Sequence, residues 1–214
     1  MIELKHIKWL DQGANRVCYI HPDDPGKVLK IIKPWKRAEL KRRIAPFYKR
    51  FRSVRCFDDN QQELKALRLL EKKKNASRHF PKCYGMVDTD LGQALCLEYV
   101  CSGWKEGEAL SLEKYLHANG FTPEIMKALD DLFGFLYENI IITRDMRCFN
   151  IMVRYVDDKI NLVIVDGLGN SEFIPVSNFI PAVGRLKIQR KFNRFKNRLD
   201  RIIGNNIWKI PALG

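Results

Sequence analysis

Hydrophobic and polar residues alternate along the first hundred positions in the way that is typical of β-strands joined by tight turns. Turn-forming residues, among them Pro, Asp and Gly, cluster at 21–26 and 88–92 and separate successive stretches of alternating residues. Helical spacing of Leu64, Leu67, Leu69 and Leu70 predicts one helix between the third and fourth stretches. The pattern therefore predicts an antiparallel five-stranded sheet with one helix. The expected strands lie at 7–10, 17–20, 27–33, 83–87 and 94–100.

The second half of the chain has mainly helical spacing. A glycine-containing linker at 101–107 precedes a short helix that opens at Ser111 and a longer helix capped by Thr122. Further strand patterns predict a second hairpin, at 151–155 and 161–165. We therefore expect an α+β fold with two lobes. The N-terminal lobe covers residues 1–100, and a reduced, mainly helical C-terminal lobe covers residues 101–214.

Two stretches of the chain are strongly basic. An insertion at 34–58 interrupts the N-terminal lobe, and within it residues 36–55 carry nine Lys/Arg and a single acidic residue, Glu39. Residues 185–201 are also rich in Lys/Arg and have the spacing of a basic amphipathic helix. Such stretches are either solvated surfaces or binding sites for an anionic partner, and the pattern leaves both interpretations open.

Composition narrows the class of protein. A hydrophobic fraction of 46% excludes a mostly disordered chain. A net charge of +13 favours anionic partners such as nucleotides, nucleic acids or acidic lipids. The sequence has neither an apolar run of the roughly 18 residues that a transmembrane helix needs nor a signal-peptide pattern, so we expect a cytoplasmic protein. The six cysteines form no Cys-x-x-Cys pair and predict reduced thiols.

Three polar residues in the second half have the types and the order that phosphoryl transfer needs. Asp145 and Asn150 bracket a loop before the second hairpin, and Asp166 directly follows that hairpin. Because the hairpin reverses the chain, Asp166 is expected near Asn150, where carboxylate and amide oxygens suit Mg²⁺. Asp145 would then orient an attacking hydroxyl group. The same residues also have ordinary interpretations as helix caps and turn residues.

With these residues in order, the chain resembles the protein-kinase superfamily over roughly residues 7–169. Residues 143–150 occupy the place of its catalytic loop. The resemblance implies a phosphotransferase that depends on ATP and Mg²⁺, in which Asp145 is the catalytic carboxylate and Asn150 and Asp166 hold the metal.

The resemblance also implies roles in the N-terminal lobe. Lys30 would contact the nucleotide phosphates, and Glu63 on the following helix would pair with Lys30. Glu39 competes for that pairing, and Glu63 also has helix neighbours, Lys65 and Arg68, with which it could form a surface pair. The remaining implied contacts are Gly13 in the phosphate-covering loop, Glu98 and Val100 in the hinge beside an adenine, and Arg147 near the transferred phosphate.

Three segments resemble a narrower family, the bacterial YrbL family, which is named for the PhoP regulatory network. They are residues 13–22, 80–85 and 166–175. This second resemblance implies membership of a family but no particular reaction.

The chain departs from the kinase pattern in several places. Thr143 stands where a histidine usually precedes the catalytic Arg-Asp, the phosphate-covering loop keeps one glycine, and Gly167 replaces the usual Phe. Only 48 residues (214 − 166) follow Asp166, which favours a small-molecule or glycolipid acceptor over a general protein substrate. Two other functions remain open: a pseudokinase-like regulatory protein that binds a nucleotide or a partner, and a protein that binds nucleic acid or an anionic membrane through the basic stretches.

Overall fold

The computed structural model describes residues 1–51, 53–102, 108–144, 146–168 and 181–204; within these, the side chains of residues 48 and 49 are not described. The described residues form two compact units. The first contains Met1–Val100 together with Leu168, and the second contains Cys101–Gly167 together with the C-terminal helix.

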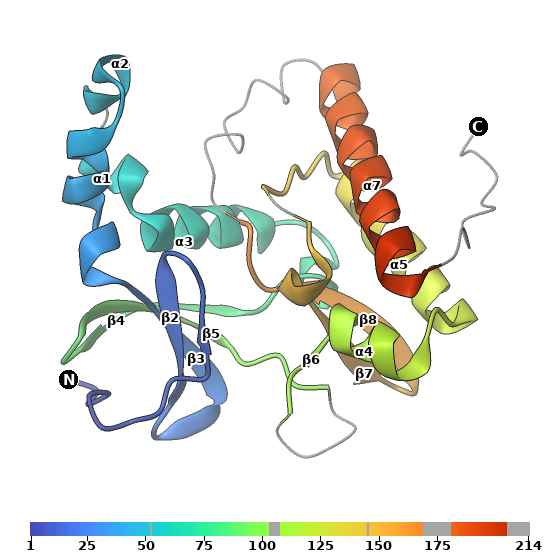
Figure 1. Cartoon of the computed structure of the whole chain (residues 1–214), viewed down its shortest axis with the longest axis horizontal. Helices are drawn as coiled ribbons and strands as arrows, with labels where there is room; N and C mark the ends of the chain where they lie inside the picture. Colours follow the sequence, from blue (N-terminus) through green and yellow to red (C-terminus); the bar gives the residue numbers. More distant parts are fainter. Residues whose placement is uncertain (52, 103–107, 145, 169–180, 205–214) are drawn as a thin grey trace. The chain divides into compact units, whose positions relative to one another are not determined.

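The N-terminal unit is built on a five-stranded antiparallel sheet with the strand order β1-β2-β3-β5-β4 (Figure 1). This sheet confirms the predicted fold class for the first half of the chain. The strands are β1 (Asp11–Gln12), β2 (Arg16–His21), β3 (Asp24–Ile32), β4 (Cys83–Thr89) and β5 (Gly92–Glu98).

The first strand does not lie where the hydrophobic pattern predicted it, at residues 7–10. The backbone N–H of Ile7 donates to the carbonyl of Leu4, which closes a turn, and contact with β2 starts with the N–H of Leu10, which donates to the carbonyl of Cys18, so that the paired strand is Asp11–Gln12. The prediction of a strand at 7–10 is therefore wrong. Ile7 does pack on the core, but it does so from a turn, and an apolar residue in a turn gives the same hydrophobic signal as one in a strand.

The two faces of the sheet have different coverings. On β3, Leu29 and Ile31 point to one face, where they pack with Leu4 of the N-terminal segment. The carboxylate of Asp90 fixes that segment, because it accepts the backbone N–H of Leu4 at 2.8 Å and that of Lys5 at 3.1 Å. Side chains alternate along a strand, so Lys30 points to the opposite face.

Helix α3 (Asp59–Leu70) packs on that opposite face of the sheet (Figure 1). Asp58 caps the helix, because its side chain accepts the backbone N–H of Gln61 at 2.9 Å. The buried side of α3 contains three leucines, Ala66, Asn60 and one charged residue, Glu63. The helix that the leucine spacing predicted is therefore present, and it carries a carboxylate into the core.

The basic insertion is largely helical. Its elements are η1 (Pro34–Lys36), α1 (Ala38–Ile44), α2 (Phe47–Arg50) and η2 (Val54–Phe57), all placed before α3. A further short helix, η3 (Ala76–Arg78), follows α3.

The second unit combines helices with a three-stranded antiparallel sheet, β6-β7-β8, in agreement with the expected mainly helical half and its hairpin. Ser111 and Thr122 cap α4 and α5 through their side-chain oxygens, as predicted. The elements are β6 (Leu110–Ser111), α4 (Leu112–Asn119), α5 (Pro123–Glu138), η4 (Cys148–Asn150), β7 (Ile151–Val156), β8 (Lys159–Ile164) and α7 (Pro181–Ile203).

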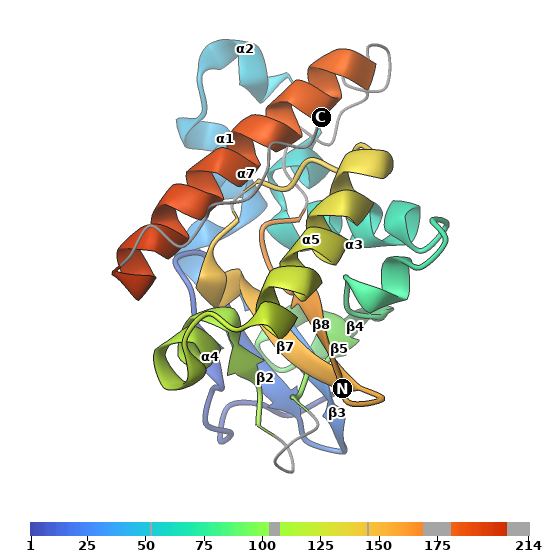
Figure 2. The ribbon, with the colours of Figure 1, turned by 90° about the vertical axis from the view of Figure 1, so that its right-hand side faces the viewer.

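Helix α7 lies against α5 within this unit (Figure 2). The ring of Phe133 on α5 meets two rings of α7, Phe192 at 3.8 Å and Phe195 at 5.6 Å between centroids. The basic amphipathic helix expected at 185–201 is therefore present, and its apolar side belongs to the core of the unit. Among the described residues, no helix is both long and apolar enough to cross a membrane.

Candidate phosphoryl-transfer site

A buried ion pair joins the sheet and the helix of the N-terminal unit. The ammonium of Lys30 on β3 lies 2.8 Å from Oε1 of Glu63 on α3. Both residues are almost inaccessible to solvent, with 6% of Lys30 and 0% of Glu63 exposed. The competing residue, Glu39, is exposed on α1 and lines a pocket of the insertion. The structure thus places Glu63, and not Glu39, against Lys30.

Glu63 holds a second cation that the sequence patterns did not reveal. A guanidinium nitrogen of Arg16 on β2 contacts Oε2 of Glu63, so the two carboxylate oxygens serve two different cations. Asn60, one turn before Glu63, donates its amide to the carbonyl of Lys30 at 2.8 Å and accepts from Arg16 at 3.3 Å. Because a buried charge is stable only when it is paired and hydrogen-bonded, this network explains how three charged groups remain inside the unit.

The loop that was predicted to cover phosphates is a tight connection between β1 and β2. The N–H of Gly13 donates to the carbonyl of Arg16 at 3.0 Å, and the carbonyl of Asn15 accepts the N–H of Lys33 at 2.9 Å. One carboxylate oxygen of Asp59 accepts both the side-chain amide of Asn15, at 3.0 Å, and the ammonium of Lys41, at 2.5 Å. The loop is therefore tied to the start of α3 and to helix α1 of the insertion.

The predicted hinge residues lie at the end of β5. The N–H of Glu98 donates to the carbonyl of Lys82 at 2.9 Å, while the Glu98 carboxylate accepts the N–H of Lys82 at 3.0 Å. Tyr99 donates its N–H to the carbonyl of Gly26, and Val100 is buried. Backbone bonds thus hold this segment in an extended conformation beside β3 and β4.

In the second unit, Asn150 and Asp166 lie on neighbouring stretches of backbone. The carbonyl of Asn150 accepts the N–H of Val165, the residue before Asp166, at 2.9 Å. Asp166 accepts the N–H of Gly167 at 2.7 Å, and Gly167 adopts a positive φ of 84° that suits glycine. The hairpin β7–β8 therefore returns the chain to Asn150, which is the geometry that the sequence led us to expect.

Asp145 lies outside the described residues, but the backbone on both sides of it is well connected. The N–H of Arg144 donates to the carbonyl of Gly167 at 2.8 Å. Lys191 of α7 donates to the carbonyl of Arg144 at 2.9 Å, and Arg198 of the same helix donates to the carbonyl of Met146 at 3.0 Å. These two basic side chains of α7 are seven residues apart, so they lie on one side of the helix and contact the segment that the sequence predicts to be a catalytic loop.

The remaining residues of this segment have varied surroundings. Arg147 is exposed, and its guanidinium carbon lies 5.5 Å from the ring centre of Phe149. Cys148 is buried, and burial raises the pKa of its thiol to about 12. The hydroxyl of Thr143 is buried and has no hydrogen-bond partner among the residues that the structure describes.

The donor set near Asp166 fits a hard divalent cation. Asp166 offers a carboxylate and Asn150 an amide oxygen, and Mg²⁺ prefers such oxygen ligands while retaining several waters. Within the described part of the chain, no group of three or more His, Cys, Asp or Glu side chains forms another candidate metal site.

Together these features define a class of protein. A five-stranded antiparallel sheet, with a lysine on its third strand paired to a glutamate on the helix that covers the sheet, is the arrangement of a protein-kinase-like N-terminal lobe. The chain belongs to the family described as PhoP regulatory network protein YrbL, whose model matches residues 2–200.

Two curated relatives and two solved structures are similar to this chain. The YrbL proteins of Escherichia coli (strain K12) and Shigella flexneri are each 23% identical over 199 residues, which cover 91% of this chain and 86% of theirs. Two mutants of the PknI kinase domain of Mycobacterium tuberculosis are similar with TM-scores of 0.43 and 0.44 and identities of 17% and 16%. The matches cover 77% and 75% of this chain and 59% and 56% of those domains.

Proposed function

We propose that the protein is a phosphotransferase that uses ATP and Mg²⁺. The observation that carries the proposal is the ion pair between Lys30 and Glu63, buried on the helix-covered face of the N-terminal sheet. Burying two charges is costly, and hydrophobic residues of similar size often give equal or greater stability. A function for the lysine ammonium therefore explains the pair better than stability does.

Each residue has a defined task in this proposal. Lys30 binds nucleotide phosphates, and Glu63 fixes the direction of the Lys30 ammonium. Asn150 and Asp166 hold the magnesium ion, which would neutralise charge that develops on the phosphate oxygens. Asp145 orients the acceptor hydroxyl group and takes its proton. Arg147 and the backbone near Gly13, Glu98 and Val100 complete the nucleotide contacts.

Thermal melting with and without Mg·ATP tests the binding step. A ligand that binds only the folded state stabilises it by about 2.7 kcal/mol at a concentration of 100 times its Kd. The wild type should melt at a higher temperature with nucleotide, and Lys30→Met should lose most of that increase. Lys27→Met is the matched control, because Lys27 lies on the same strand in an exposed pair with Asp24.

Release of ADP, measured over a panel of hydroxyl-bearing acceptors, tests the transfer step. Asp145→Asn and Asp166→Asn should each lower turnover at least a hundredfold, whereas Asp157→Asn in the β7–β8 turn should not. Asp157 has a φ of 49°, which asparagine also tolerates. A nucleotide-dependent rise in melting temperature without turnover would instead identify a regulatory nucleotide-binding protein. Absence of both responses would contradict the proposal.

A further inference from the structure

The helical insertion of the N-terminal unit exposes large hydrophobic side chains. Ile44 at the end of α1 is 84% exposed, Phe47 at the start of α2 is 73% exposed, and Phe51 just after α2 is 82% exposed. Trp35 in η1 is also largely exposed. The rings of Phe47 and Phe51 lie 6.2 Å apart, and four large apolar side chains are exposed within seventeen residues (35–51), a concentration that is typical of interaction surfaces.

The same insertion carries exposed positive charge. Arg42 on α1 is anchored, because its Nε donates to the carbonyl of Arg50 at 2.8 Å, and Nε of Arg50 donates to the carbonyl of Ala45 at 2.8 Å. These bonds join the end of α1 to α2, so both arginines belong to the same helical pair as Ile44 and Phe47. Arg42, Arg43 and Arg50, with Glu39 and Val54, line a pocket of about 600 Å³.

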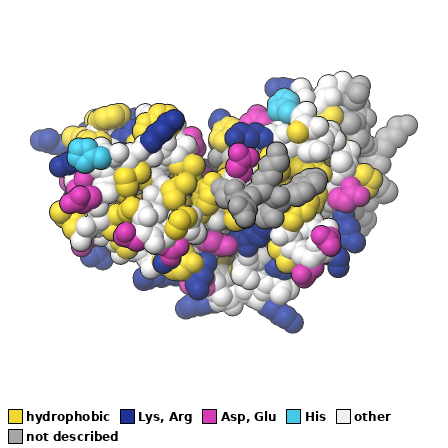
Figure 3. All heavy atoms as spheres, turned by 90° about the horizontal axis from the view of Figure 1, so that it is seen from below, with side chains coloured by type: hydrophobic (Ala, Val, Ile, Leu, Met, Phe, Trp, Pro, Cys, Tyr) yellow, Lys and Arg dark blue, Asp and Glu magenta, His cyan; other side chains and the backbone are white. Residues whose placement is uncertain are grey.

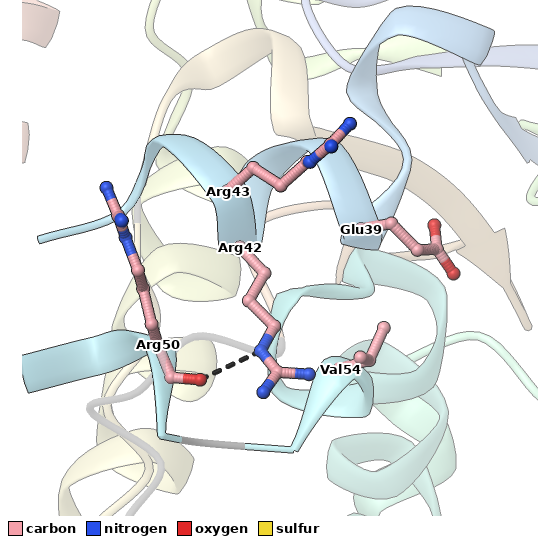
Figure 4. A pocket seen from close by; sticks show the side chains of 5 residues that line it. All are labelled: Glu39, Arg42, Arg43, Arg50 and Val54. Carbon is pink, nitrogen blue, oxygen red and sulfur yellow. Dashed lines mark hydrogen bonds between the residues drawn. The ribbon is translucent and has the colours of Figure 1, made fainter. Parts of the chain in front are cut away.

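The arrangement of these charges indicates the kind of partner. In Figure 4 the guanidinium groups of Arg42, Arg43 and Arg50 point in different directions and do not meet at one point. A single phosphate ion would require convergent groups. A surface that carries many phosphates can satisfy groups that diverge.

Two kinds of surface carry many phosphates, nucleic acids and acidic membranes, and the exposed apolar side chains favour the membrane. A nucleic acid would pair with the arginines, but it offers little that would bury an aliphatic side chain such as Ile44. An acidic bilayer attracts Lys/Arg to its headgroups and also buries Ile and Phe below them. On the face of the molecule drawn in Figure 3, by contrast, basic, acidic and hydrophobic side chains are interspersed. We propose that the helical insertion docks the protein on the surface of an anionic phospholipid membrane, with Ile44, Phe47 and Phe51 as apolar anchors.

This docking is independent of the phosphotransferase proposal and has its own test. The full chain is sedimented with vesicles of phosphatidylcholine alone and of phosphatidylcholine with phosphatidylglycerol. Binding should require phosphatidylglycerol and should fall with added salt, because surface charges are screened over about 10 Å at 0.1 M. Trp35 lies in the insertion and supplies a second signal, a blue shift of its fluorescence on acidic vesicles that Trp35→Phe should remove.

Two sets of variants separate a specific surface from general attraction. Ile44→Ser/Phe47→Ser/Phe51→Ser should lower partitioning at least tenfold, whereas Trp9→Ser/Leu69→Ser/Met126→Ser, at other exposed positions, should leave it within about twofold. Arg42→Gln/Arg43→Gln/Arg50→Gln should lower it about a hundredfold, since each basic residue near an acidic membrane contributes roughly fivefold. Lys72→Gln/Lys73→Gln/Lys74→Gln removes the same charge from an exposed turn and is the control.

The outcomes that would overturn the proposal are specific. Equal losses in the test and control sets would show non-specific attraction, and an absence of binding to acidic vesicles would contradict docking directly. Preferential binding of DNA or RNA over acidic vesicles, lost in the arginine variant, would assign the surface to nucleic acid instead. Because exchange of Arg42 or Arg50 removes a bond between α1 and α2, melting of each variant is recorded, and the serine set keeps the test decisive if the arginine set unfolds.

Discussion

The two units stabilise their candidate functional residues in different ways. In the N-terminal unit, opposite charges meet inside the core: Lys30 and Arg16 share the carboxylate of Glu63. In the second unit, Asn150 and Asp166 are placed by backbone hydrogen bonds, and basic side chains of α7 hold carbonyls of the preceding loop. The first arrangement depends on compensation of charge, and the second depends on a helix far along the chain.

This difference has a consequence for mutation. Removal of one member of a buried charge network leaves its partners unpaired in a medium that solvates them poorly. Removal of one donor to a backbone carbonyl leaves a neutral group that water can reach more easily. We therefore expect larger losses of stability in the first unit than in the second.

The largest effect should follow from Glu63→Ala. Without the carboxylate, Lys30 and Arg16 remain close together with one counterion fewer, and breaking a buried ion pair costs about 3–5 kcal/mol of unfolding free energy. Urea denaturation measures the loss, and Glu3→Ala at an exposed position is the control. A loss below about 1 kcal/mol would mean that the charges of the network are solvated, contrary to the structure.

A smaller effect should follow from Lys191→Met and Arg198→Met. Each removes a charge-assisted hydrogen bond to the catalytic-loop segment, worth about 1.5–3 kcal/mol when buried and less at these partly exposed positions. Hydrogen exchange should become faster at the amide of Arg144, and turnover should fall more than nucleotide affinity. The controls are Lys187→Met and Arg194→Met on the same helix. Unchanged exchange at Arg144 would show that α7 does not support the loop.

The smallest effect concerns pH. Burial raises the pKa of Cys148 from 9.0 to about 12, so the folded state keeps a proton that the unfolded state releases above pH 9. This contribution to stability is complete below pH 9 and is lost as the pH rises toward 12. Unfolding free energy should fall with pH in that window by at most about 1.4 kcal/mol per unit from this group.

Cys148→Ser should flatten that dependence, because serine does not titrate there. Cys56→Ser, at an exposed thiol, is the control for the exchange of cysteine for serine itself. Denaturant titrations at pH 8, 9 and 10 measure both variants. Equal slopes in the wild type and Cys148→Ser would contradict a buried, protonated thiol.

Local patterns in the sequence predicted the elements that depend on local rules. Strand alternation, the caps Ser111 and Thr122, and the turn before Lys159 all involve neighbours within a few residues. The return of Asp166 toward Asn150 was predictable for the same reason, because a hairpin reverses the chain. The error at residues 7–10 arose because an apolar segment in a turn has a similar composition to a strand.

The contacts between distant segments were not predictable in this way. Arg16 precedes Glu63 by 47 residues, and Lys191 follows Arg144 by the same separation. A basic residue on an amphipathic helix has many available partners, and its position alone does not select a backbone carbonyl. Likewise, the excess of arginine and lysine at 36–55 gave no sign that Ile44, Phe47 and Phe51 would be exposed beside it.

The carboxylate of Asp59 has a wider consequence. One of its oxygens accepts both from Asn15, in the loop after β1, and from Lys41, on α1 of the insertion. Two segments that share a single acceptor atom are not energetically independent. If binding of a partner to the insertion shifts Lys41, the hydrogen bond of Asn15 to the same oxygen changes as well. Thermodynamic reciprocity then applies: a ligand bound at the loop changes the affinity of the insertion for its partner by the same factor by which the partner changes the affinity of the loop for that ligand.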